Sequence, residues 1–268
     1  MKFYGDNTFK KGISCMISHP EKPSIEKQLE LFAEMGFASV FFAAGTISDF
    51  SKIVDFSNFA KICGVEIEAV HAPSWGVGDV WRMDKNTNAY QEEIENVIRH
   101  CNAGKVPMLV MHTALKGDEP ITDKGLAFYE KIGEIAKING VKIAYENANS
   151  VEHLKAVLQH SDSFHGFCYD FGHKHCYEPD VDMLAWFGDR LLYTHIHDNI
   201  KALKKDMHLL PFDGDIQWKE EISKLKQMHY QGTWNLELSA SHSQQYQNVS
   251  FRALIEEAKC RLEALYKL

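Results

Sequence analysis

The sequence predicts an α/β fold, a single (β/α)8 TIM barrel over residues 1–268, from three observations. Short apolar segments alternate with amphipathic, helix-like segments along the chain, eight of each. At 268 residues the chain has the length of one such barrel, and no linker or low-complexity tract divides it. Six of the apolar segments run into an acidic or imidazole side chain. A doubly wound open sheet is the alternative, but the glycine-rich phosphate turn that usually follows its first strand is missing here.

The predicted strands are apolar runs of the kind that parallel sheets bury on both faces. They cover residues 13–17, 39–43, 65–70, 108–111, 141–145, 166–169, 191–194 and 234–236. The predicted helices carry start and stop signals, such as Pro23-Ser24 before the first and Gly36, Gly64 and Gly104 after the first three. These helices cover residues 25–35, 50–63, 86–103, 123–138, 151–159, 180–187, 218–228 and 249–267. Loops are expected at residues 73–81 and 198–217.

The chemistry-bearing side chains stand where the predicted strands end. Read from the third strand onward, they are His71, His112, Glu146, Asp170, His195 and Glu237. In a barrel the carboxyl ends of all strands meet on one face, so these residues are expected to be neighbours in space. Carboxylate and imidazole together suit Zn, Mn, Fe or Co, and the lack of thiolates argues against a purely structural zinc site.

At each position, a structural role of the side chain is the alternative to metal binding. A lone histidine at a strand end is more often hydrogen-bonded scaffold than ligand. The two glutamates are harder to explain in that way, because Glu146 and Glu237 lie within apolar runs. Burying a carboxylate costs several kcal/mol unless the group is paired or bound to metal. An internal salt bridge is the alternative, but few Lys or Arg residues occupy the other strand ends, which favours a metal site.

Three further segments add metal-competent residues. His173 follows Asp170 by three residues, where it orients Asp170 or binds a ligand itself. Asp206 and His208 lie in the long loop after the seventh strand, where surface charge is the alternative explanation. His197 and Asp198 lie beside His195 and are interpreted as supports for it. Five histidines without supporting context are assigned to surface or core: His100, His153, His160, His165 and His175.

Composition excludes several classes of protein. The net charge of −8 disfavours a nucleic-acid partner. The six cysteines form no CxxC pair and are interpreted as reduced core residues. No apolar run approaches the roughly 20 residues that span a bilayer, and the first residues lack an apolar signal-peptide stretch. We therefore expect no membrane association and a cytoplasmic location.

Seven segments together resemble the xylose-isomerase-like TIM-barrel superfamily, specifically its sugar phosphate isomerase/epimerase group. The segments are Val70-His71-Ala72-Pro73-Ser74, Val110-Met111-His112, Tyr145-Glu146-Asn147, Tyr169-Asp170-Phe171-Gly172-His173, His195-Ile196-His197-Asp198-Asn199, residues 206–214, and Asn235-Leu236-Glu237. The resemblance covers nearly the whole chain. It is specific for the superfamily and says little about the substrate.

The resemblance implies site residues. In ketose 3-epimerases of the superfamily one divalent ion is held by four residues that match Glu146, Asp170, His195 and Glu237, and the two glutamates also transfer protons. The superfamily includes three-zinc AP endonucleases, whose nine ligands match these four together with His71, His112, His173, Asp206 and His208. These five are therefore expected to bind substrate or additional metal. The epimerase pattern also carries an arginine after the strand-seven histidine, where this chain offers only Lys201, Lys204 and Lys205.

The function expected from the resemblance is a metal-dependent isomerase or epimerase. Its substrate would be a sugar, a sugar phosphate or a related polyol or keto acid, and protons would move through a metal-stabilised enediolate. The expected cofactor is a divalent Zn, Mn or Co, as one ion or more, and the resemblance leaves a homodimer open. Trp75 and Trp81 either line the pocket or pack on the barrel. A multi-zinc phosphodiester hydrolase of the AP endonuclease type is the alternative, and a sugar-binding barrel without catalysis ranks last.

Overall fold

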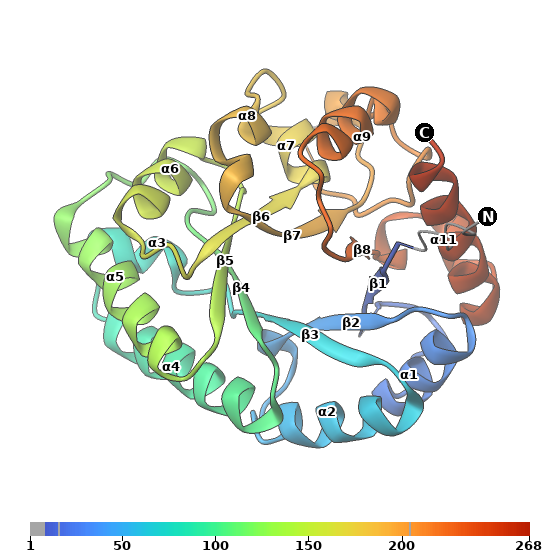
Figure 1. Cartoon of the computed structure of the whole chain (residues 1–268), viewed down its shortest axis with the longest axis horizontal. Coiled ribbons are helices and arrows are strands. Elements are labelled where there is room, and N and C mark those ends of the chain that lie inside the picture. Colours follow the sequence, from blue (N-terminus) through green and yellow to red (C-terminus); the bar gives the residue numbers. More distant parts are fainter. Residues whose placement is uncertain (1–8, 16, 204) are drawn as a thin grey trace, which may run out of the picture.

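The strands close into one barrel. A computed structural model describes residues 9–15, 17–203 and 205–268. In it eight parallel strands follow one another in chain order, and β8 pairs with β1 to complete the ring (Figure 1). The helices surround this ring of strands on the outside (Figure 1). The predicted fold class, a (β/α)8 barrel, is therefore confirmed.

The strand boundaries agree with the sequence pattern except at β1 and β7. The strands are β1 Lys11–Ser14, β2 Ser39–Ala43, β3 Glu66–His71, β4 Met108–His112, β5 Lys142–Glu146, β6 Gly166–Asp170, β7 Leu191–Ile196 and β8 Trp234–Leu236. β1 begins two residues earlier than its apolar run, because Lys11 and Gly12 pair with β8. A Cβ at Gly12 would lie 1.9 Å from Asn235 Oδ1, so only glycine fits at this closing seam.

The helices differ from the prediction mainly where they are short. They are α1 Ile25–Glu34, α2 Lys52–Cys63, α3 Val77–Arg82, α4 Thr87–Gly104, α5 Asp123–Ile138, α6 Val151–His160, α7 Phe171–Tyr177, α8 Met183–Phe187, α9 Trp218–Gln227, α10 Gln244–Gln247 and α11 Phe251–Tyr266. The predicted loop 73–81 thus contains most of α3, and α7 and α10 were not predicted. Helices of one or two turns are too short to show a hydrophobic period.

Local signals explain where the long helices begin. The side chains of Ser24, Thr122, Ser150 and Ser250 each accept a hydrogen bond from the backbone N–H three residues ahead, as N-caps do. No helix among the described residues is long and apolar enough to cross a membrane.

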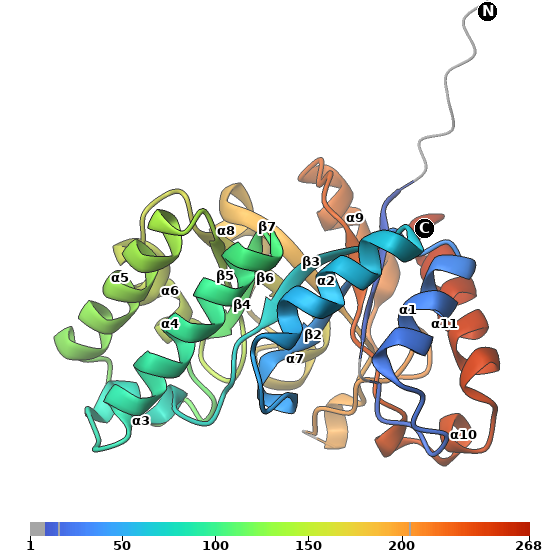
Figure 2. The same ribbon diagram turned by 90° about the horizontal axis from the view of Figure 1, so that it is seen from below.

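Two apolar layers hold the barrel together. The larger lies between strands and helices, and a smaller one fills the barrel interior with residues such as Phe41, Val110 and Tyr193. Figure 2 shows α3 and α10, which follow the carboxyl ends of β3 and β8, along the lower side of the molecule. The carboxyl ends of the strands, where the predicted site residues stand, therefore face the lower side in this view.

Candidate metal centre at the carboxyl face

Strand register brings the predicted residues together. His112 at the end of β4 is paired across the sheet with Glu146 of β5, and Asp170 of β6 is paired with His195 of β7. Because adjacent parallel strands align these pairs at one rim, residues far apart in the chain become neighbours.

Glu146 lies at the centre of the cluster. It is fully buried. Its Oε2 atom lies 2.9 Å from the Nε2 atoms of both His71 and His112, and its Oε1 atom lies 2.6 Å from His195 Nδ1. Burial alone would raise the pKa of the Glu146 carboxyl, but the imidazoles of His195 and His112 hold that pKa well below its usual range. The carboxylate is therefore ionised and surrounded by nitrogen atoms.

The four residues matched to an epimerase metal site converge as predicted. One ligand atom each from Glu146, Asp170, His195 and Glu237 lies within 4.8 Å of the other three. His195 Nδ1 is 3.1 Å from Glu237 Oε2 and 3.8 Å from Asp170 Oδ2. Burial alone would lower the pKa of His195, but the carboxylates of Glu237 and Glu146 raise it well above its usual value. Three carboxylates and one imidazole thus lie close together.

Atoms without hydrogen bonds indicate that this arrangement suits a cation. His112 Nε2 and Glu237 Oε2 are buried, and their contacts with Glu146 Oε2 at 2.9 Å and with His195 Nδ1 at 3.1 Å lack hydrogen-bond geometry. Buried polar atoms are rarely left in this state unless an ion or another group binds them. Cys168, which sequence reasoning assigned to the core, forms a further group with Glu146 and His195. Burial raises the pKa of its thiol well above the usual value, which disfavours a thiolate ligand.

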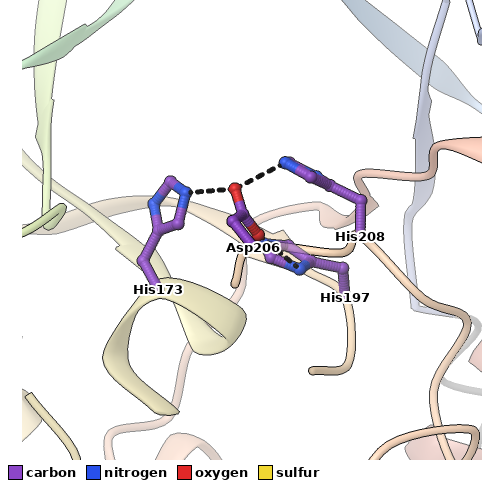
Figure 3. A group of neighbouring side chains, drawn as sticks. All are labelled: His173, His197, Asp206 and His208. Atoms are coloured by element: carbon purple, nitrogen blue, oxygen red, sulfur yellow. Dashed lines mark hydrogen bonds and ion pairs between the residues drawn. The ribbon is translucent and has the colours of Figure 1, made fainter. Parts of the chain in front are cut away.

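A second group lies beside the first and consists of His173, His197, Asp206 and His208 (Figure 3). Asp206 Oδ2 is 3.0 Å from His173 Nε2 and 2.8 Å from His208 Nε2. Burial alone would lower the pKa of His208, but Glu237 and Asp206 raise it to about 9. His71, His112 and Glu146 form a third group. The structure therefore brings all nine predicted residues into one connected cluster and adds His197 to them.

Asp170 connects the cluster to the start of α7. Its Oδ1 atom accepts a hydrogen bond of 2.6 Å from the backbone N–H of His173 and so caps the helix. Asn147 holds the same strand end from the other side, because its side chain both donates to the Asp170 carbonyl and accepts from the Asp170 N–H. Sequence analysis gave Asn147 no role, although it adjoins Glu146.

Asp198 organises the long loop that carries Asp206 and His208. Its carboxylate accepts four hydrogen bonds, from the backbone N–H groups of Asn199, Phe212 and Ile216 and from the indole N–H of Trp218. The side chain of Asn199 then donates to Asp206 Oδ1 and accepts from the N–H of Met207. Asp198 therefore supports the loop more than it supports His195, which was its predicted role.

A pocket of about 410 Å³ opens beside the cluster. Ser14, Phe41, His71, His208 and Glu237 contribute to its wall, and none of the described residues that line it is a lysine or arginine. The Glu237 side chain is 20% exposed, whereas that of Glu146 is fully enclosed. A ligand in this pocket would meet Glu237 first.

The tryptophans and lysines singled out in the sequence lie elsewhere. Trp81 is buried and donates to the carbonyl of Thr113, so it packs on the barrel. Trp75 is half exposed and donates to Glu93. Lys201 and Lys205 are exposed, and Lys204 lies outside the described residues.

The five unassigned histidines fit a structural assignment. His165 is buried, accepts from the N–H of Ile143 and contacts the carbonyl of Gly133. His153 is also buried. The other three are partly or largely exposed, and each has a local partner: His100 with Asn96, His160 with Ala156 and His175 with Asp215.

Comparison with known proteins identifies related chains. A family model described as xylose isomerase-like TIM barrel matches residues 29–259. An uncharacterized protein of Sinorhizobium fredii is 33% identical over 162 residues, which are 54% of this chain and 51% of that protein. The chain spans about half the length of the curated relatives it matches.

Solved structures of the same fold cover nearly the whole chain. D-psicose 3-epimerase from Clostridium cellulolyticum, solved with D-tagatose, has a TM-score of 0.78 and 15% identity, with 97% of this chain and 99% of that chain covered. A D-tagatose 3-epimerase-like protein has a TM-score of 0.72 and 23% identity, with the same coverage of 97% and 99%. At these identities the likeness is one of fold.

Proposed function

The chain belongs to the xylose isomerase-like TIM barrel family, and from that premise we propose that it is a divalent-metal-dependent isomerase or epimerase of a sugar or sugar derivative. The observation that carries the proposal is the convergence of Glu146, Asp170, His195 and Glu237 within 4.8 Å beside an open pocket. Sugar 3-epimerases among the solved structures of the same fold support the reaction class.

The four converging residues are proposed to hold one Zn, Mn or Co ion. Their oxygen and nitrogen donors match what these metals bind, and the 3.1 Å contact of Glu237 Oε2 with His195 Nδ1 lacks hydrogen-bond geometry. An ion held there would polarise a substrate carbonyl or hydroxyl and so acidify the neighbouring C–H bond. His71, which lines the pocket, is proposed to contact substrate oxygens, whereas His208 lines the pocket and belongs to the second group.

Proton transfer is proposed to involve the two glutamates. Burial alone would raise the pKa of Glu237, but His195 and His208 lower it, so the carboxylate is ionised and able to accept a proton. It also faces the pocket. Glu146 is proposed as the second group, and the Nε2 atoms of His71 and His112 lie 2.9 Å from its Oε2 atom.

Replacement of Glu237 tests the proton-transfer role. Glu237→Gln keeps the size of the side chain and removes its ability to accept a proton. We expect the variant to remain folded and to lose exchange of the substrate C–H with solvent deuterium, as measured by NMR on a panel of ketoses and ketose phosphates. The panel includes phosphorylated sugars because none of the described residues that line the pocket is a lysine or arginine that could bind a phosphate group.

Trp75→Phe is a matched control on the exposed surface and should exchange as the wild type does. Wild-type deuterium exchange by Glu237→Gln, in a variant with unchanged circular dichroism, would refute the proposed role of Glu237. An absence of any exchange by the metal-loaded wild type across the panel would count against the isomerase or epimerase function itself.

A multi-zinc phosphodiester hydrolase remains the second candidate, and one observation favours it. The described residues contain several adjoining groups of ligand atoms rather than one, and clustered metals suit hydrolysis. The net charge of −8 opposes a nucleic-acid substrate. Metal analysis separates the two functions: three tightly held zinc ions per chain would favour the hydrolase, and one or two exchangeable Mn or Co ions would favour the epimerase.

A further inference from the structure

His197 lies between the two neighbouring ligand groups and contacts both. It comes one residue after the end of β7 and is fully buried. Its Nε2 atom is 3.0 Å from Oδ2 of Asp170, which belongs to the first group. Its Nδ1 atom faces the second group, 3.7 Å from Asp206 Oδ1 (Figure 3).

The hydrogen bond to Asp170 determines which nitrogen of His197 is free. A carboxylate only accepts hydrogen bonds, so His197 Nε2 is the donor. In a neutral imidazole the other nitrogen then carries the lone pair. That atom, Nδ1, is buried and has no hydrogen-bond partner among the described residues. A buried lone pair directed into a group of one carboxylate and two further imidazoles is placed as a metal ligand would be.

The ring of His197 is held so that it cannot turn away. It stacks on His208 with the ring centres 4.2 Å apart and the planes at 19°. Gly172 also lies against the ring, and a Cβ added there would come within 2.0 Å of His197 Cε1. Glycine at 172 therefore leaves the space that the imidazole occupies, and both nitrogen atoms keep their separate directions.

We propose that His197 joins two cation sites: through Nδ1 it supplies a fourth ligand to the additional ion that the resemblance already implies at His173, Asp206 and His208, while its Nε2 orients Asp170 toward the first ion. The inference rests on the proposed function only in that a first ion is bound by Glu146, Asp170, His195 and Glu237. Ligand atoms of a tetrahedral zinc ion lie about 3.3 Å apart, given bonds of about 2.0 Å. The second group lies within 4.8 Å and needs only small side-chain movements to reach that geometry.

Two substitutions separate the two nitrogen atoms. In His197→Gln the amide nitrogen can replace Nε2 as donor to Asp170, but nothing replaces the Nδ1 lone pair. In His197→Asn the amide oxygen replaces Nδ1, but the donor to Asp170 is lost. His208→Asn, which removes a ligand of the second group and does not contact Asp170, marks the loss of the second ion. Glu146→Gln marks the loss of the first.

Metal stoichiometry and Co²⁺ absorption report both sites without reference to activity. Full-length protein is titrated with Co²⁺ against a competing chelator, and bound metal is measured after dialysis. We expect His197→Gln to reproduce the loss seen in His208→Asn, with the second ion bound about 10- to 100-fold more weakly. We expect His197→Asn to weaken the first ion as well, by about 10-fold or more. Circular dichroism of the metal-free variants checks that both are folded.

The outcomes are distinct. One outcome is that the His208→Asn variant loses an ion that both His197 variants bind with wild-type affinity. In that case the bridging role of His197 is wrong and the proposed function is unaffected. If both His197 variants weaken both ions equally, His197 acts through the fold alone and the inference fails. If wild type binds no divalent ion, the proposed function fails together with it.

Discussion

Two buried histidines of this chain, His195 and His165, have pKa values that their surroundings shift in opposite directions. His195 is buried among carboxylates, and Glu237 and Glu146 raise its pKa in spite of burial. His165 is buried among backbone groups, and burial lowers its pKa. Its Nδ1 atom accepts from the N–H of Ile143 at 2.9 Å. A proton on Nδ1 would remove that acceptor, so the fold holds His165 neutral.

His165 predicts a pH dependence of stability. Its folded-state pKa lies below its unfolded value of about 6.5, so only the unfolded chain gains a proton as the pH begins to fall through that value. The stabilising contribution is therefore complete above about pH 6.5 and is lost as the pH drops below it. We expect His165→Gln, measured by urea unfolding from pH 5 to pH 8, to show a shallower decline toward acid than wild type. An identical slope would contradict the prediction.

Among the elements, the loop after β7 determines whether the second ligand group forms. Asp206 and His208 lie in this loop, and Asp198 holds it closed with four accepted hydrogen bonds and a two-way backbone pairing with Leu209. A Cβ at Gly214 would lie 2.2 Å from Asp198 Oδ1, so glycine is needed for the loop to approach the carboxylate.

Substitution at Asp198 should therefore loosen the loop without opening the barrel. Asp198→Asn turns an amide NH₂ toward at least one buried donor, which costs about 1–3 kcal/mol for each donor left unpaired. We expect faster hydrogen exchange of backbone amides in residues 198–217 and little change in the strands, as measured by mass spectrometry. Gly214→Ala should give the same local pattern. Unchanged protection of the loop in both variants would show that Asp198 does not hold it.

At the scale of the whole molecule, the ligand cluster connects five strands, a helix and a loop. Residues of β3, β4, β5, β6 and β7 contact one another around Glu146 and Asp170, and Glu237 directly follows β8. Without an ion, the carboxylates of Glu146 and Glu237 are paired with imidazoles among the described residues. An ion bound at this rim would therefore connect most of the barrel at one point.

Metal binding should raise the stability of the whole barrel. A ligand at 100 times its Kd stabilises the folded state by about 2.7 kcal/mol. In a chain of this size each kcal/mol shifts the Tm by roughly 2–4 °C. We therefore expect the Tm to rise by about 5–10 °C when excess Zn²⁺ or Co²⁺ is added to chelator-treated protein in scanning calorimetry. Mg²⁺, which prefers all-oxygen sites, is the matched control and should give a smaller shift. Equal Tm values with and without Zn²⁺ would argue against an ion in the cluster.

The sequence by itself determined the barrel and most of the cluster. Apolar runs alternating with amphipathic helices predict parallel strands, and parallel strands place residues such as Glu146 and Glu237 on one face whatever the details of packing. That inference needs only the order of the strands along the chain and their parallel direction. Both follow from the alternation of strands and helices in the sequence. The nine predicted site residues therefore appeared in the sequence as strand-end or loop residues before any distance was known.

Only the tertiary structure decided which side chains share a point and what holds them. His197 is two residues from His195 in sequence, yet its two nitrogen atoms lie near Asp170, at the end of β6, and Asp206, in the loop after β7. Helix α7 and the hydrogen bonds to Asp198 were not predictable, since a helix of two turns shows no period and a loop closes through contacts between distant residues. The hydrophobic period of the sequence predicts which residues are buried. Strand register and loop closure determine which of the buried atoms come into contact.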